Sequence, residues 1–151
     1  MSCIQSHYPP EHTLCFGCGP ANPAGLHIQT HWDGEQGICR FTPKPEHMAY
    51  GGVVYGGLIA CLMDCHSIAT AIAAAYQAEG RTLESLPRIN MVTGNLNVTY
   101  KAPTPIDGEL LLTARVSETG PKKTLVECEL LAGGKVTAVG KVLGIRFEPK
   151  E

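Results

Sequence analysis

The residue that stands out chemically is Asp64, a carboxylate inside an apolar run with Leu62, Met63, Cys65 and Ile68 as its neighbours. Carboxylates are rarely buried without a partner. Helical spacing gives Asp64 mostly small neighbours along its own stripe, so a ligand or another backbone can approach it closely. One interpretation is a general base or nucleophile in an apolar pocket. The other is an ordinary helix aspartate, solvated or hydrogen-bonded.

A pair of glycines, Gly56-Gly57, stands where the predicted helix begins. The first turn of a helix exposes N–H groups at the positive end of the helix dipole, and glycine leaves them open because it has no Cβ. A thioester or ester carbonyl placed there would have its developing oxyanion stabilised. The alternative is a flexible connection before a helix. Asp64 lies about two turns further along the same helical face, and its presence there favours the oxyanion-binding interpretation.

Two further polar residues lie in apolar surroundings. Thr93, in the run Thr93-Gly94-Asn95 of an otherwise apolar strand, can position a water or simply pack, and Gly94 can mark a bulge or a close backbone approach. His66 lies about 200° around the helix from Asp64 and cannot pair with it directly. We expect His66 to be a hydrogen-bonded helix histidine without a catalytic role.

The pair Cys15-x-x-Cys18 resembles half of a zinc site or a redox pair. A structural zinc site needs four ligands. His12, Cys39 and several other histidines are available, but no second CxxC or HxxxH motif accompanies the pair. We therefore predict no metal site and no cofactor, and keep a zinc-binding interaction module as a weaker hypothesis.

The elements that must position these residues follow from periodicity. A helix is predicted from Leu58 to about Glu79, with no Pro or Gly inside it and Gly80 at its end. Alternating apolar residues predict strands over residues 26–32, 38–42, 88–101, 109–117, 123–131 and 135–147. Two strands, one long helix and four strands favour an α+β fold in which an antiparallel sheet packs on one helix. Residues 1–24 are predicted to be a lead-in segment and residues 25–151 a single domain.

Composition narrows the class of protein. A chain of 151 residues is enough for one domain, and its net charge of −2 argues against a nucleic-acid binder that uses bulk positive charge. Charged residues make up 17% of the chain, below the usual ~25%, which favours partial coverage of the surface by another subunit. Seven cysteines in no disulfide-scaffold spacing, and no signal-like N-terminus, predict a reduced, cytoplasmic location. The longest apolar stretch, near residues 53–75, is a poor membrane span because Asp64 and His66 interrupt it.

Taken together, these motifs resemble a known family over residues 15 to 147, nearly the whole chain. The hotdog-fold acyl-CoA thioesterases of the PaaI type, which are 4-hydroxybenzoyl-CoA thioesterase-like, share three features with this sequence. These are the lead-in Cys15-Phe16-Gly17-Cys18-Gly19 with Asn22-Pro23 and Gly25-Leu26, the Tyr55-Gly56-Gly57 run with Asp64 nine residues after Tyr55, and the strand segment from Asn95 to Pro103.

The resemblance implies a hotdog fold, with a curved antiparallel sheet of about five to six strands wrapped around one long central helix. It implies a homodimer, often paired further into a tetramer, with the active site at the dimer interface. It also assigns roles: Asp64 matches the acidic catalytic residue, Gly56 and Gly57 the oxyanion-hole region, and Thr93 a hydroxyl residue that assists the attacking water. Tyr55 replaces a histidine common in relatives, and a tyrosine can donate a hydrogen bond to a thioester carbonyl.

We therefore predict an acyl-CoA thioesterase that produces free acid and CoA. Asn95, Met48 and Lys101 are expected to contact the substrate, Lys101 as one of the cations that CoA phosphates would require; the other candidates are Arg88, Lys122 and Lys123. Met48 stands where relatives often have a glutamine. The alternative is a hotdog protein that binds acyl-CoA or another acyl ligand without hydrolysing it, an interpretation favoured by Tyr55 and Met48. No nucleic acid or membrane partner is expected.

Overall fold

The computed structural model describes residues 3–148, which contain one long helix and six strands. Three short 3-10 helices, η1, η2 and η3, precede the long helix. The elements are η1 (Ile4–His7), η2 (Pro10–His12), β1 (His31–Trp32), β2 (Gly37–Phe41), η3 (Pro45–His47), α1 (Gly56–Ala78), β3 (Asn90–Tyr100), β4 (Leu110–Thr119), β5 (Lys123–Ala132) and β6 (Lys135–Phe147).

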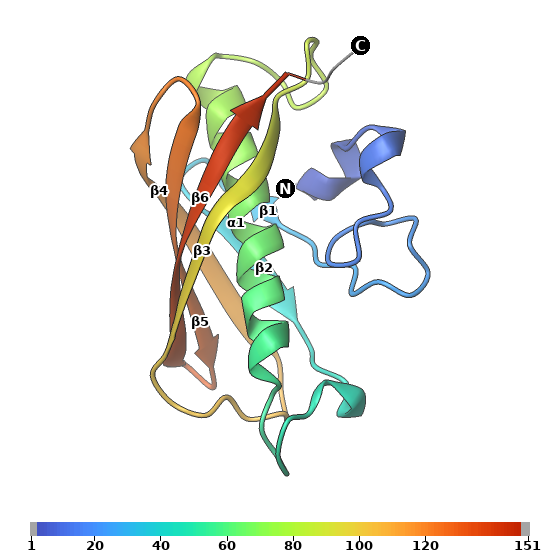
Figure 1. The fold of residues 1–151 in the computed structure, drawn as a ribbon, viewed down its shortest axis with the longest axis vertical. Coiled ribbons are helices and arrows are strands. Elements are labelled where there is room, and N and C mark those ends of the chain that lie inside the picture. Colours follow the sequence, from blue (N-terminus) through green and yellow to red (C-terminus); the bar gives the residue numbers. More distant parts are fainter. Residues whose placement is uncertain (1–2, 149–151) are drawn as a thin grey trace.

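The sheet has the strand order β1-β2-β4-β5-β6-β3, and every pair of neighbours is antiparallel. It curves around one side of α1, while the lead-in segment lies on the other side of the helix (Figure 1). The predicted α+β hotdog fold is therefore confirmed. Local signals predicted an antiparallel sheet on one helix, and the family resemblance implied its curved hotdog form. The alternating apolar residues of β4, β5 and β6 turn toward the helix and are buried there.

The helix packs on the sheet so closely that two strand positions have no room for a side chain. A Cβ on Gly37 of β2 would collide with the Thr70 hydroxyl, and a Cβ on Gly140 of β6 would lie 2.7 Å from the Met63 sulfur. Leu62 and Met63 are fully buried at this contact. Close packing of this kind fixes the helix relative to the sheet, because a shift in either direction costs contacts or creates overlap.

Helix α1 is long and apolar enough to cross a bilayer by length and composition alone. Most of its apolar residues are instead buried by the sheet and the lead-in segment, and the helix is apolar nearly all round. This is the position of a core helix, in agreement with the expectation that the stretch does not span a membrane.

The first predicted strand, residues 26–32, is wrong for most of its length, because only His31–Trp32 pairs with β2. The preceding residues are bonded to the lead-in segment instead. The amides of Leu26 and Ile28 donate to carbonyls of residues 16 and 17, and the carbonyl of Thr30 accepts from the Ile4 amide. The alternating pattern thus reflects burial of Ile28 and Thr30, and not pairing within the sheet.

The lead-in segment is held on α1 by a buried polar chain. The Gln5 side chain accepts a hydrogen bond from the Thr30 amide at 2.8 Å, and the Thr30 hydroxyl lies 2.9 Å from Nδ1 of His66. All three side chains are buried. His66 is therefore a core histidine hydrogen-bonded to Thr30, and its ring takes part in attaching residues 3–24 to the helix.

Burial lowers the pKa of His66 from 6.5 to about 4. Between these values the unfolded chain binds a proton that the folded protein does not, so stability is complete above pH 6.5 and is lost as the pH falls toward 4. The expected loss is about 3 kcal/mol. Urea titrations from pH 7.5 to 4 measure it. The free energy of unfolding should depend less steeply on pH in His66→Asn, and as steeply as in the wild type in His12→Asn, where a half-exposed histidine is replaced. The same pH dependence in all three proteins would contradict the prediction.

Candidate active site

Asp64 lies on α1 with its carboxylate at the wall of a cleft of about 440 Å³. The cleft is bounded by α1, the start of β3 and the lead-in segment, and most of its lining is apolar, with Leu14, Ile68 and Met91 among the contributors. The side chain of Asp64 is half-buried. A carboxylate in such a site is shielded from bulk solvent without being sealed from a substrate.

The Thr93 hydroxyl donates a hydrogen bond to the Asp64 carboxylate. The contact joins two residues that the sequence analysis selected for separate reasons. A bulge in β3 accompanies it: Thr93 pairs with Gly144 and Asn95 with Leu143, so Gly94 has no partner. Thr93 is therefore held toward the helix at the edge of the cleft.

Asn95, just past the bulge, lies on the other face of the sheet. Its partner on β6 is Leu143, between Val142, which is fully buried, and Gly144, where a Cβ would lie 3.4 Å from Ile68 of α1. Because neighbouring strand residues point to opposite faces, Leu143 and Asn95 point away from the helix. The structure thus separates Asn95 from Asp64 within one chain.

The glycine pair forms the first turn of α1, which begins two residues before the predicted start. The first amide to bond back is that of Leu58, which donates to the Tyr55 carbonyl at 3.1 Å, so the amides of Gly56 and Gly57 precede the helical ladder. A Cβ on Gly57 would lie 2.5 Å from the Tyr55 ring, and one on Gly56 would lie 3.4 Å from the Tyr100 ring. The two glycines therefore lie between two tyrosine rings.

Tyr100 is a site residue that the sequence analysis did not select. Its hydroxyl donates a 2.6 Å hydrogen bond to the Gly56 carbonyl, and partial burial raises its pKa, so the hydroxyl stays protonated at neutral pH. The sequence did carry a signal, because Leu96, Val98 and Tyr100 alternate on one predicted face. That face turns out to meet the helix, where Val98 packs on the core.

The segment before α1 holds this end of the helix in place. The Tyr55 amide donates to the His47 carbonyl and the Val54 amide to the Thr104 carbonyl, both at 2.8 Å. Met48 pairs with Val54 and is 42% exposed, and Lys101 directly follows Tyr100 at the end of β3. The predicted contacts Met48 and Lys101 are thus gathered near the glycine pair and not near Asp64.

The glycine pair and Asp64 do not open onto the same space within one chain. Seven helical residues separate Gly57 from Asp64, about 10 Å along the axis. Gly57 and Tyr55 line a second cleft of about 630 Å³, which also contains His47 and Cys61, whereas Asp64 lines the first. A single carbonyl group cannot contact both from one chain.

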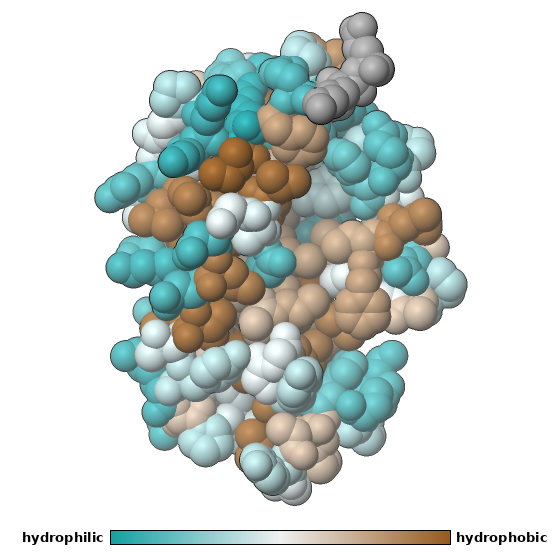
Figure 2. Space-filling view, in the orientation of Figure 1, coloured by the Kyte–Doolittle hydropathy of each residue, from teal (hydrophilic) through white to brown (hydrophobic). Residues whose placement is uncertain are grey.

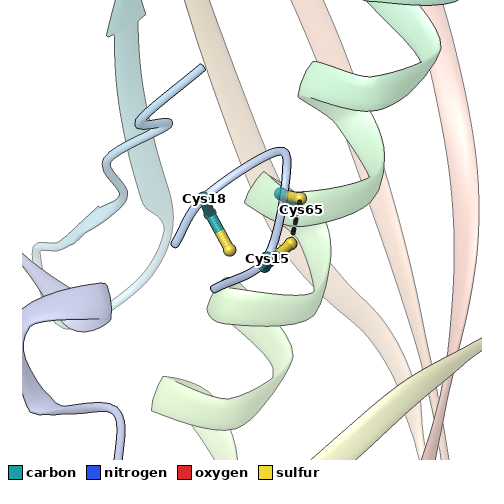
Figure 3. A group of neighbouring side chains, drawn as sticks. All are labelled: Cys15, Cys18 and Cys65. Carbon is teal, nitrogen blue, oxygen red and sulfur yellow. Dashed lines mark hydrogen bonds between the residues drawn. The ribbon is translucent and has the colours of Figure 1, made fainter. Parts of the chain in front are cut away.

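The lead-in loop brings Cys15 and Cys18 to α1, where they meet Cys65 (Figure 3). The Cys15 and Cys65 sulfurs are 3.9 Å apart. Cys15 and Cys65 are 50 positions apart in sequence, so their contact was not predicted. The only sequence signal for a thiol group on the helix was the i, i+4 pair of Cys61 and Cys65. Cys39, considered as a partner, lies fully buried in β2, where burial raises the pKa of its thiol to about 12.

Comparison with known proteins identifies the family. The Thioesterase superfamily matches residues 51–141, which run from the glycine-rich approach to α1 through most of β6. Human acyl-coenzyme A thioesterase 13 is 27% identical over 106 residues, which cover 69% of this chain and 68% of that protein.

Solved structures agree with this match. A Thioesterase superfamily protein from Shewanella loihica PV-4 is 39% identical, with a TM-score of 0.65 over 84% of this chain and 99% of that one. The E. coli PaaI protein from the phenylacetic acid degradation operon is 15% identical and shares the fold, with a TM-score of 0.67 over 82% of this chain and 81% of that one. The chain therefore belongs to the thioesterase superfamily, and it shares the hotdog fold of the PaaI protein.

Proposed function

We propose that this protein hydrolyses an acyl-CoA thioester to free acid and CoA, with Asp64 as general base or nucleophile. The observation that carries the proposal is the Asp64 carboxylate, half-buried at the wall of an apolar cleft and hydrogen-bonded by Thr93. A cleft of about 440 Å³ lies in the range of small-molecule sites. The acyl group occupies this cleft, and the thioester carbonyl lies at its mouth.

The reaction follows from the groups available. Asp64 either takes a proton from a water that attacks the carbonyl carbon, or attacks that carbon itself. Thr93 orients the carboxylate in both cases. The carbonyl oxygen becomes negative and is stabilised by the amides of Gly56 and Gly57, after which the C–S bond breaks. CoA leaves as a thiolate, which needs no strong general acid. In the nucleophilic route its departure leaves an acyl anhydride on Asp64, and a water then hydrolyses this anhydride to the free acid and the regenerated carboxylate.

Completing this site requires a second copy of the chain. Strand β3 ends the sheet, and the described residues give its outer edge no neighbouring strand. It is 11 residues long and exposes Val92, Leu96 and Tyr100. Apolar side chains gather along the middle of the face on which β3 lies (Figure 2). A long apolar edge of this kind is a site of strand pairing, so we propose a homodimer formed through β3.

The two ends of β3 explain how such a dimer would assemble the site. Thr93, near one end, is bonded to Asp64, and Tyr100, near the other end, is bonded to Gly56. Antiparallel pairing about a two-fold axis near residues 96–97 brings Thr93 opposite Tyr100 of the partner subunit. Asp64 then faces Gly57 of the partner subunit, and the dimer contains two composite sites. The family resemblance extends this expectation to a dimer of dimers.

In this arrangement two of the predicted substrate contacts, Met48 and Lys101, lie where the CoA part of the substrate would bind. Met48 and Lys101 lie near the partner end of each composite site, where Lys101 offers a positive charge to the CoA phosphates. Tyr55 covers Gly57 with its ring. The Tyr55 hydroxyl, which lies beside Gly57, can donate a hydrogen bond to the bound thioester.

The position of the Tyr55 ring also favours the second candidate, a hotdog protein that binds an acyl ligand without hydrolysing it, because the ring covers the face of Gly57. Release of thiol from short, branched, aromatic and long acyl-CoA thioesters distinguishes the two functions. We expect release from at least one of them. Tight binding of an acyl-CoA without thiol release from any would support the binding function instead.

A further inference from the structure

Three cysteine sulfurs converge where the lead-in loop meets α1, and a fourth cysteine lies nearby on the helix. Cys15, Cys18 and Cys65 have their sulfurs within 4.8 Å of one another, and Cys61 lies one helical turn before Cys65 on the same face. We refer to these four residues as the thiol cluster. Figure 3 shows Cys15 and Cys18 on the lead-in loop, next to Cys65 on the helix.

The loop is held in this position by its own backbone. The Gly19 amide donates to the Cys15 carbonyl at 2.8 Å, and the Ile28 amide to the Gly17 carbonyl at 3.0 Å. Gly17 comes so close to the helix that a Cβ there would collide with the Cys65 sulfur and lie 3.2 Å from the Cys61 sulfur. The absence of a side chain at this position therefore lets the loop reach the helical thiols.

The spacing fits a coordinated ion better than a disulfide. Four thiolates around Zn²⁺ at about 2.3 Å have sulfurs about 3.8 Å apart in a tetrahedron, and the Cys15 and Cys65 sulfurs are 3.9 Å apart. A disulfide requires about 2.05 Å and would use only two of the four sulfurs. Thiolates are also the ligands that thiophilic ions prefer.

We propose that the thiol cluster binds one Zn²⁺ ion through Cys15, Cys18 and Cys65, with Cys61 as the fourth ligand. The ion fastens the lead-in loop to α1, where Cys15, Cys18 and Cys65 line the cleft that contains Asp64. Its role is structural: it fixes one wall of that cleft and takes no part in thioester hydrolysis.

Zn²⁺ ligation requires thiolates, so the thiols of the cluster lose their protons as the ion binds, and protons are released to the buffer.

Titration of the reduced, metal-free full-length protein with Co²⁺ and then Zn²⁺ tests the proposal. We expect one Co²⁺ per chain, with sulfur-to-cobalt charge-transfer absorption and the visible bands of a tetrahedral centre, both removed by one equivalent of Zn²⁺. Cys15→Ser and Cys65→Ser should weaken binding by at least about 100-fold, since losing even a supporting hydrogen bond to a ligand costs about 10–100-fold. Cys3→Ser, outside the cluster, should bind like the wild type.

Several outcomes would overturn the proposal: no stoichiometric metal uptake by the reduced wild type, equal uptake by the cluster variants, or a bond between Cys15 and Cys65 that costs two hydrogens in mass and forms in preference to metal binding. If a variant fails to fold, alkylation of the wild type supplies the answer, since Zn²⁺ should protect Cys15 and Cys18 but not Cys3. None of these measurements uses thioester turnover, so the result is independent of the proposed activity.

Discussion

Asp64→Asn is expected to lower the rate of acyl-CoA hydrolysis by about 10²–10⁴-fold, the range supplied by a positioned general base. Asparagine has nearly the same shape and can still accept a hydrogen bond from Thr93, which bonds Asp64 in the wild type, so the fold and the acyl cleft should be unchanged. The amide neither takes a proton from water nor attacks a carbonyl. Thiol release from the best substrate of the acyl-CoA panel measures the effect, beside the thermal midpoint.

Asp107→Asn is the matched control, because Asp107 is an exposed residue in the loop before β4. It should hydrolyse the substrate at the wild-type rate. Wild-type hydrolysis by Asp64→Asn would remove the acid from the mechanism, whatever its position in the cleft. A loss of activity accompanied by a lower thermal midpoint would instead indicate damage to the fold.

Mixing two inactive variants is expected to restore hydrolysis, because the proposed site takes its acid from one chain and its amides from the other. Asp64→Asn supplies intact amides, and Gly57→Ala supplies an intact acid. After unfolding and refolding together, half of the dimers are mixed, and one of the two sites in each is fully wild type. Activity should rise from near zero to about 25% of wild type.

The glycine variant of this pair needs its own control. A Cβ at Gly57 would lie 2.5 Å from the Tyr55 ring and therefore forces the ring or the helix start to move. Alanine keeps the amide N–H, so the expected effect comes from displacing this donor, and losing one oxyanion donor costs about 10²–10³-fold in rate. Gly51→Ala is matched, since a Cβ there meets nothing within 4 Å. Failure of the mixture to exceed the sum of the two variants would place acid and amides in one chain, contrary to the proposal.

Much of the scaffold could be predicted because its signals are local. The helix expected over residues 58–79 is α1, Gly56–Ala78, and the strands expected from residue 88 onward match β3 to β6 within a few residues. Prolines, glycine turns and alternating side chains determine these limits directly. Residues 26–30 misled because their alternation arises from contacts with the lead-in segment, which no periodicity distinguishes from sheet pairing.

The site could be predicted only in parts. Asp64, Thr93 and the glycine pair were selected as single residues, and the Asp64–Thr93 hydrogen bond was not, because it depends on the register of β3 beside α1. The shared helical face suggested that the acid and the amides serve one carbonyl. Their opening onto two different clefts depends on the segments that pack around α1, and the sequence pattern does not reveal these contacts. The contact between Cys65 and Cys15 was not predicted, because it depends on the path of the lead-in loop, which no local sequence pattern reveals.

The cleft that contains Asp64 has two walls of different construction, one formed by α1 and β3 and the other by the lead-in segment. Gly37 and Gly140 let the sheet pack closely on Thr70 and Met63, and this packing holds the part of α1 from which Asp64 projects. The opposite wall is made of lead-in side chains such as Leu14, which is 66% exposed. Substitutions in the lead-in wall can therefore change the volume available to the acyl chain while the Asp64 carboxylate keeps its position. Substrate preference can then change without a change in the catalytic groups.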